Sequence, residues 1–116
     1  MTDSIEIEAS KEKFKAELAD NILKKSWGLS MRNKGKMFFV FSRPGRPPID
    51  MMLVQRPLYL YFLDSGKEVV DVQFAEPWTF DPRTWRIYRP EVDAKYLLES
   101  FEELDLKEGD KVSFDL

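Results

Sequence analysis

A chain of 116 residues is long enough for one domain that buries roughly two thirds of the surface its unfolded form exposes. It contains no cysteine and no histidine, which excludes disulfides, thiolate or imidazole metal sites, cysteine nucleophiles and Ser-His-Asp triads. Charged residues make up 34% of the chain and leave a net charge of -3, so the composition predicts a globular domain with a highly charged surface.

The first ten residues, "MTDSIEIEAS", carry acids and no apolar run of signal-peptide length. Nowhere does the sequence approach the roughly 20 apolar residues that a membrane-spanning helix needs. We therefore expect a single cytoplasmic domain over residues 1–116, with no membrane partner. No pattern indicates a cofactor or a metal, and without histidine and cysteine any metal would have to be bound by oxygen ligands.

The first half of the chain predicts strands around one short helix. Residues 5–8 and 14–18 alternate apolar with polar side chains, the period of half-buried strands. Residues 21–32 predict a helix, with Asp20 or Asn21 as its N-cap and Gly28 near its end. The apolar run "MFFVF" at 37–41 predicts a buried strand that ends at the proline-rich "SRPGRPP".

The second half predicts further strands joined by turns. Residues 50–55 and 58–64 are apolar runs, in which Met51 and Met52 are both expected in the core. A tight turn at "DSGK" leads into a partner strand at 68–74, and 94–100 forms another strand. "FEELDL" predicts a helical turn before a terminal strand. Together these elements predict a mainly β fold, an antiparallel barrel or sandwich with one short helix.

The order of short motifs resembles the domain-of-unknown-function 192 family, and its archaeal members in particular, from about Phe14 to Leu116. Four blocks carry the resemblance: the helix pattern Lys25, Gly28, Leu29 and Arg32, the strand Gly35 to Phe41, the segment Pro57 to Asp64, and the Pro77-Trp78 loop followed by Tyr96 to Glu99 and Gly109-Asp110. Ser30 stands where the family usually has Met, and Tyr59 where it has Asp. The resemblance implies a compact β-rich domain with barrel or jelly-roll-like topology, and it implies no particular reaction.

The most distinctive segment is "EPWTFDPRTWRIYRPE" at 76–91, where prolines prevent a regular helix or strand. Its aromatic faces offer stacking surface, and its arginines offer forked donors. A loop of this length that stays ordered is often functional. The candidate ligand-binding residues are Arg32, Trp78, Arg83, Trp85, Arg86 and Tyr88. The alternative is a loop that seals one end of the fold, with Trp78 as an apolar plug.

If this loop, the segment 43–48 and Arg32 meet at one end of the fold, they form a cationic and aromatic surface. We therefore predict a non-enzymatic binding or accessory module, without assigned catalytic residues. Its partner is expected to be a small anionic or carbohydrate-like ligand, or a protein or peptide, and not duplex nucleic acid, because the chain is acidic overall. The alternatives are a small hydrolase-like enzyme that uses carboxylates and a binder of single-stranded nucleic acid.

Overall fold

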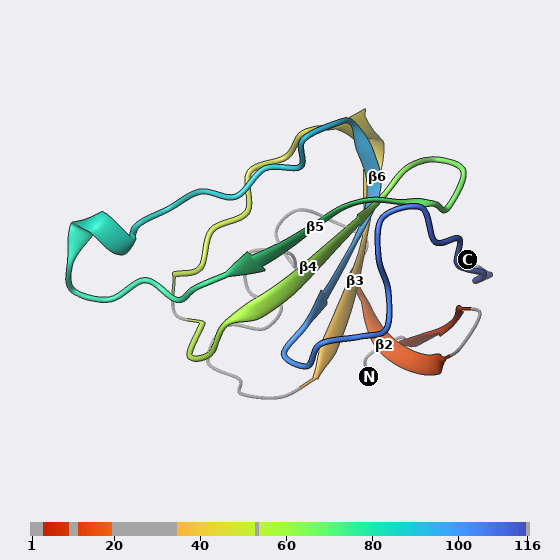
Figure 1. Ribbon diagram of the computed structural model, residues 1–116, viewed down its shortest axis with the longest axis horizontal. Helices are drawn as coiled ribbons and strands as arrows, with labels where there is room; N and C mark the ends of the chain where they lie inside the picture. The colour runs from red at the N-terminus through yellow and green to blue at the C-terminus, as the bar shows by residue number, and fades with distance from the viewer. Residues whose placement is uncertain (1–3, 10–11, 20–34, 53, 116) are drawn as a thin grey trace.

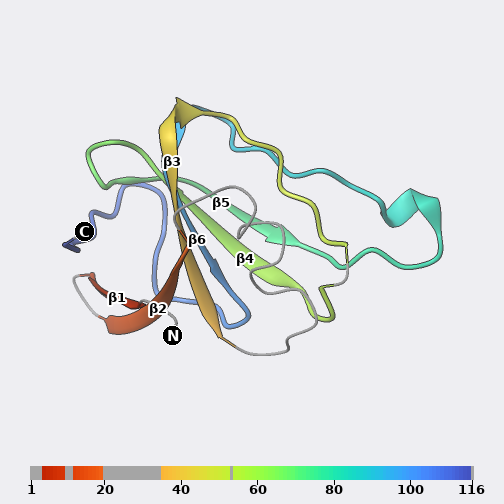
Figure 2. The ribbon, with the colours of Figure 1, turned by 180° about the vertical axis from the view of Figure 1, so that it is seen from behind.

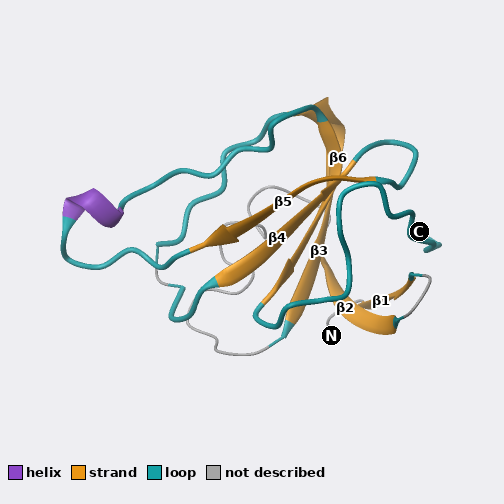
Figure 3. Ribbon diagram, in the orientation of Figure 1, coloured by secondary structure: helices purple, strands orange, loops and turns teal. Residues whose placement is uncertain are grey.

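The computed structural model describes residues 4–9, 12–19, 35–52 and 54–115 of the chain. Its elements, in chain order, are β1 (Ser4–Glu8), β2 (Lys13–Ala19), β3 (Lys36–Gly45), β4 (Leu58–Leu63), β5 (Val69–Ala75), the short 3-10 helix η1 (Pro82–Thr84) and β6 (Ala94–Ser100) (Figure 1). The strands form one sheet in the order β1-β2-β3-β6-β4-β5. The mainly β fold predicted from the sequence is confirmed (Figure 3).

The sheet is mixed. Only β2 and β3 run parallel among the described neighbours, and the other four pairs are antiparallel. Parallel neighbours need a crossover of about a dozen residues or more, and the chain between Ala19 and Lys36 has that length. The helix predicted for residues 21–32 lies outside the described residues. No helix among the described residues is long and apolar enough to cross a membrane.

Both faces of the central strands are buried. Consecutive residues of a strand point to opposite faces, and here Phe38 and Tyr61 pack in one hydrophobic cluster while Phe39 and Phe62 pack in the other. A strand covered on both sides can be apolar at every position, which explains the runs "MFFVF" and "LYLYFL". The chain must therefore supply covering segments for two faces of one sheet.

The C-terminal segment covers one face of the sheet and contacts both of its edges, at β1 and next to β5. Ser113 exchanges two backbone hydrogen bonds with Glu8 of β1, at 2.9 and 2.7 Å. Lys111 forms a bridge with Glu68, just before β5. Phe114 packs edge-on against Phe38, at 4.8 Å between ring centroids. These isolated bridges replace the predicted terminal strand, and the sheet does not close into a barrel.

The strand predicted at 37–41 is longer than expected. β3 continues through Pro44 to Gly45, although the proline-rich segment was expected to end it. Pairing with β6 shifts register between Val40 and Gly45, and Gly45 then pairs with Ala94. A proline lacks a backbone N–H, and it is tolerated at such an irregularity, where the ladder is interrupted.

Two other predictions are wrong. Residues 50–52 and 54–55 form no strand, because Val54 N–H bonds to Met51 O and Met52 N–H to the Asp50 carboxylate, so the chain turns here. Residues 101–106 contain no helical turn. The buried hydroxyl of Tyr61 accepts from Leu104 N–H at 2.7 Å and lies 3.3 Å from Leu104 O, which fixes this irregular stretch against the sheet.

Burial raises the pKa of Tyr61 above its ordinary value of 10.0, so the hydroxyl keeps its proton as a donor. Replacing Tyr61 with Phe should lower the free energy of unfolding by about 1–3 kcal/mol, because it leaves the buried Leu104 N–H without the Tyr61 hydroxyl, while Leu104 O keeps its bond from Leu106 N–H at 2.8 Å. Urea denaturation measures the change. The half-buried Tyr59 is the control, since its hydroxyl makes no hydrogen bond within the described part of the chain. Equal effects of Tyr61→Phe and Tyr59→Phe would contradict the prediction.

Candidate functional site

The connection between β5 and β6 projects from the sheet with η1 at its tip, alongside the chain that follows β3 (Figure 1, Figure 2). We call residues 43–57 and 76–91 together the arm. Ile49 and Tyr88 exchange two backbone hydrogen bonds of 2.7 and 2.8 Å. Arg46 Nε donates to Pro90 O at 2.6 Å, and Arg89 Nη1 donates to Arg46 O at 3.0 Å. The two segments that the sequence predicted to converge therefore lie side by side.

A dense local network fixes the tip of the arm. The Asp81 carboxylate accepts from the backbone N–H of Arg83 at 2.9 Å and caps η1. The same carboxylate accepts from Arg83 Nε and from Nη2, the latter at 2.7 Å. Thr84 Oγ1 accepts from Thr79 N–H and donates to Asp81 O. The tip thus uses its charged side chains and its threonine to hold its own shape.

Trp78 and Trp85 form the aromatic surface of the arm. Their rings are stacked, with centroids 6.0 Å apart and planes inclined by 28°. Trp78 Nε1 donates to Arg86 O at 2.9 Å, and Trp85 Nε1 donates to Thr79 O at 2.8 Å. Both indole N–H groups are used within the arm, so a ligand would meet ring surface and not these two donors.

A groove with a volume of about 730 Å³ lies against these rings. Its lining is mainly apolar and consists of Met52, Val54, Gln55, Trp78, Thr79, Phe80 and Trp85. Phe80 is wholly exposed, and Met52 and Trp85 are about half exposed. Exposed aromatic and aliphatic groups gathered in one hollow are typical of a binding surface.

The predicted site residues have different roles in the structure. Trp78 and Trp85 meet in the groove. Arg83 is bound to Asp81, and Tyr88 packs against the core while its hydroxyl accepts from Glu76 N–H at 3.1 Å. The Arg86 side chain is exposed, and no ion pair or hydrogen bond within the described residues occupies its guanidinium. The sixth candidate, Arg32, lies outside the described residues.

Sequence reasoning missed Met52 as a groove residue. Both members of the Met51-Met52 pair were expected in the core, but only Met51 is buried. The turn capped by Asp50 places the two neighbouring side chains on opposite sides of the chain. The signal was present in the sequence, since an Asp before an apolar pair favours a turn and not a strand.

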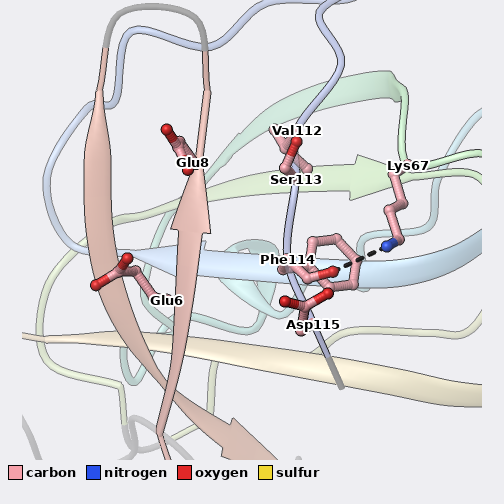
Figure 4. Close-up of a pocket in the computed structure, with 7 residues that line it drawn as sticks. All are labelled: Glu6, Glu8, Lys67, Val112, Ser113, Phe114 and Asp115. Carbon is pink, nitrogen blue, oxygen red and sulfur yellow. Dashed lines mark hydrogen bonds between the residues drawn. The ribbon is translucent and has the colours of Figure 1, made fainter.

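A second, smaller groove of about 370 Å³ is lined by β1, Lys67 and the C-terminal segment, beside the bridge between Glu8 and Ser113 (Figure 4). Glu6, Glu8 and Asp115 contribute carboxylates, but Lys67 Nζ donates to Phe114 O at 2.9 Å and lies 4.4 Å from the centre of its ring. No three acidic side chains in the described ranges are placed to share a metal ion. Lys67 thus secures Phe114, which makes this groove a seam between two packed segments.

The arm tip generates a pH prediction. Hydrogen bonds from Arg83 hold the pKa of Asp81 below its ordinary value of 3.8. Because the pKa of Asp81 is lower in the folded state, its carboxylate stabilises η1 fully above pH 3.8. This stabilisation is lost as the pH falls through the lowered folded-state pKa. An NMR titration of the Arg83 Nε–H signal should show a midpoint below 3.8, and Asp81→Asn should remove that step. A midpoint at or above 3.8 would contradict this assignment.

Comparison with known proteins finds a matching family model and several similar archaeal proteins. The DUF192 family model, described as "Uncharacterized ACR", matches residues 4–114. A UPF0127 protein from Pyrococcus abyssi is 35% identical over 107 residues, covering 86% of each chain. Another from Pyrococcus furiosus is 29% identical and covers 88% of each chain. A UPF0127 protein from Thermococcus gammatolerans is 32% identical, and the match covers 66% of its length.

Two solved structures share the fold. A protein of unknown function from Novosphingobium aromaticivorans superimposes with a TM-score of 0.75 at 20% identity, covering 97% of this chain and 84% of that one. A "putative transcription regulator" from Sinorhizobium meliloti superimposes with a TM-score of 0.77 at 17% identity, covering 98% and 94%. At these identities the likeness shows the fold alone. The family match over residues 4–114, together with the identity to the Pyrococcus abyssi protein, shows that the chain belongs to the DUF192 family, as its motifs predict.

Proposed function

We propose that this protein is a non-enzymatic binding module that holds a peptide segment of a partner protein in the groove of the arm. One observation carries the proposal: the arm is held rigid by its own hydrogen bonds, yet it leaves a connected apolar surface open. A rigid surface loses little entropy on binding, so more of the contact energy appears as affinity.

The exposure of the aromatic groups favours binding over sealing. A loop that only closed the fold would bury its large apolar side chains. Tyr88 and part of Trp78 do pack against the core, which anchors the arm. Phe80 and half of Trp85 instead remain in contact with solvent, where they cost solubility and stabilise nothing by burial. The arm therefore combines an anchored base with an open aromatic outer part.

The chemistry of the groove favours peptide binding over catalysis. Its seven lining residues include no titratable side chain, whereas acid-base catalysis needs such a group within hydrogen-bond reach of the reacting atoms. A carbohydrate would also need many polar donors, and the two indole N–H groups already bond within the arm. An apolar peptide side chain needs mainly shape and apolar surface, which aromatic residues supply at interfaces.

Selection of random displayed peptides against the intact protein tests the proposal. Wild type should enrich peptides with a large apolar side chain, and the Phe80→Ser and Trp85→Ala variants should lose their binding by roughly tenfold or more. Phe80 is wholly exposed, so its replacement should leave the melting temperature nearly unchanged.

Ile87 provides the matched control. It is about as exposed as Trp85 and lies on the arm, but it does not line the groove. Ile87→Ser should therefore bind the selected peptides as wild type does. If no peptide family is enriched, or if Ile87→Ser weakens binding as much as Phe80→Ser, the groove is not the binding surface.

A further inference from the structure

The structure also indicates the chemistry of the partner: we propose that the bound segment is acidic, with one large apolar side chain in the groove and carboxylates next to Arg56 and Arg86. This inference rests on the proposed function and deepens it. Its basis is the distribution of charge around the groove and over the whole chain.

Two arginines directly follow lining residues of the groove along the chain. Arg56 follows the lining residue Gln55, and Arg86 follows Trp85, so both side chains start within one residue of the groove. Arg56 lies over the Phe101 ring, with Cζ 5.7 Å from its centre, and Arg86 is exposed. Asp81, which follows Phe80, is neutralised by Arg83 at 2.7 Å. Carboxylates of a bound segment would therefore meet the exposed Arg86 and, further along, Arg56. One acid also adjoins the lining, since the exposed Asp50 carboxylate accepts from Met52 N–H at 3.1 Å.

The distribution of charge over the whole chain also makes the arm positive relative to the rest of the protein. The arm carries six of the seven arginines of the chain, no lysine and four acids, which gives a net charge of +2. The remaining residues carry twelve basic and seventeen acidic side chains, a net charge of -5. A positive arm on an acidic body attracts an acidic segment and orients its approach, because the body repels that segment.

A second copy of this chain fits the groove less well. Two arms brought together would place Phe80 near a partner groove, but they would also oppose two positive surfaces. The acidic body supplies the opposite charge, yet Phe74 is its one half-exposed Phe or Trp side chain within the described residues, and it packs against Tyr59. Only a partner that joins an apolar side chain to acidic neighbours satisfies both features.

The size of the groove agrees with this partner. Pockets of roughly 300–1,000 Å³ hold ligands of drug size, and the groove measures about 730 Å³. That space exceeds one aromatic side chain and admits the backbone on either side of it. The flanking residues of a bound peptide would then extend over the rim, where the arginines lie.

Four fluorescein-labelled peptides of equal length test the inference by fluorescence anisotropy with the full chain. The first has a central Phe-x-Leu flanked by aspartates, and the others replace the aspartates with asparagines, the aspartates with lysines, or Phe and Leu with alanines. We expect the acidic peptide to bind roughly tenfold more tightly than the asparagine peptide at low salt, with the difference shrinking as salt screens the charges. The alanine and lysine peptides should not bind.

Arg86→Gln should weaken binding of the acidic peptide by up to about fivefold, the range of an exposed ion pair, and leave the asparagine peptide unaffected. Arg43→Gln removes an equal charge from an exposed arm residue that neither lines the groove nor adjoins its lining, and should have a smaller effect. Equal binding of the acidic and asparagine peptides would overturn the acidic partner while leaving peptide binding intact. Binding of none of them, or tighter binding of an oligothymidine that depends on Trp85, would overturn peptide binding itself.

Discussion

Burial of the sheet on both faces is the constraint on which the rest of this structure depends. The strands carry large apolar side chains at consecutive positions, such as Phe38 and Phe39, so neither face can be left in water. One face is covered by Leu104, Leu106 and the C-terminal segment, and the other receives Ile49, Met51 and Val54 from the chain between β3 and β4. The base of the arm is therefore part of the hydrophobic core, and the outer half of the arm projects from this buried base.

That anchoring explains how irregular chain can present a defined surface. The arm has few regular backbone bonds, and side chains compensate: Arg46, Arg89 and Arg83 satisfy carbonyls or a carboxylate, and the two indoles satisfy two more carbonyls. Arg83, which the sequence proposed as a ligand donor, thus helps to hold the arm together instead. Arg86 stays exposed beside the groove, so its contribution to recognition is electrostatic orientation of a segment held mainly by apolar contact.

The buried polar groups serve the same purpose. Asp71 of β5 is buried, and its carboxylate accepts from Gln73 Nε2 at 2.6 Å and from Glu91 N–H at 3.0 Å. Gln73 Nε2 also lies 2.6 Å from Arg89 O. The returning half of the arm is therefore fastened to the outer strand of the sheet before β6 begins.

The sequence by itself determined the class of fold, most of the strands and the identity of the unusual loop, because apolar periodicity and proline content are local properties. It also indicated that Trp78 and Trp85 belong to one surface, since only six residues separate them in a segment that cannot form a regular element. Only the tertiary structure decided that β3 passes through Pro44, which of Met51 and Met52 is the buried one at their turn, and that Arg83 pairs with Asp81. Each of these depends on which partner a group meets across the fold or around a turn, and pairing between distant segments is set by the packing of the whole sheet.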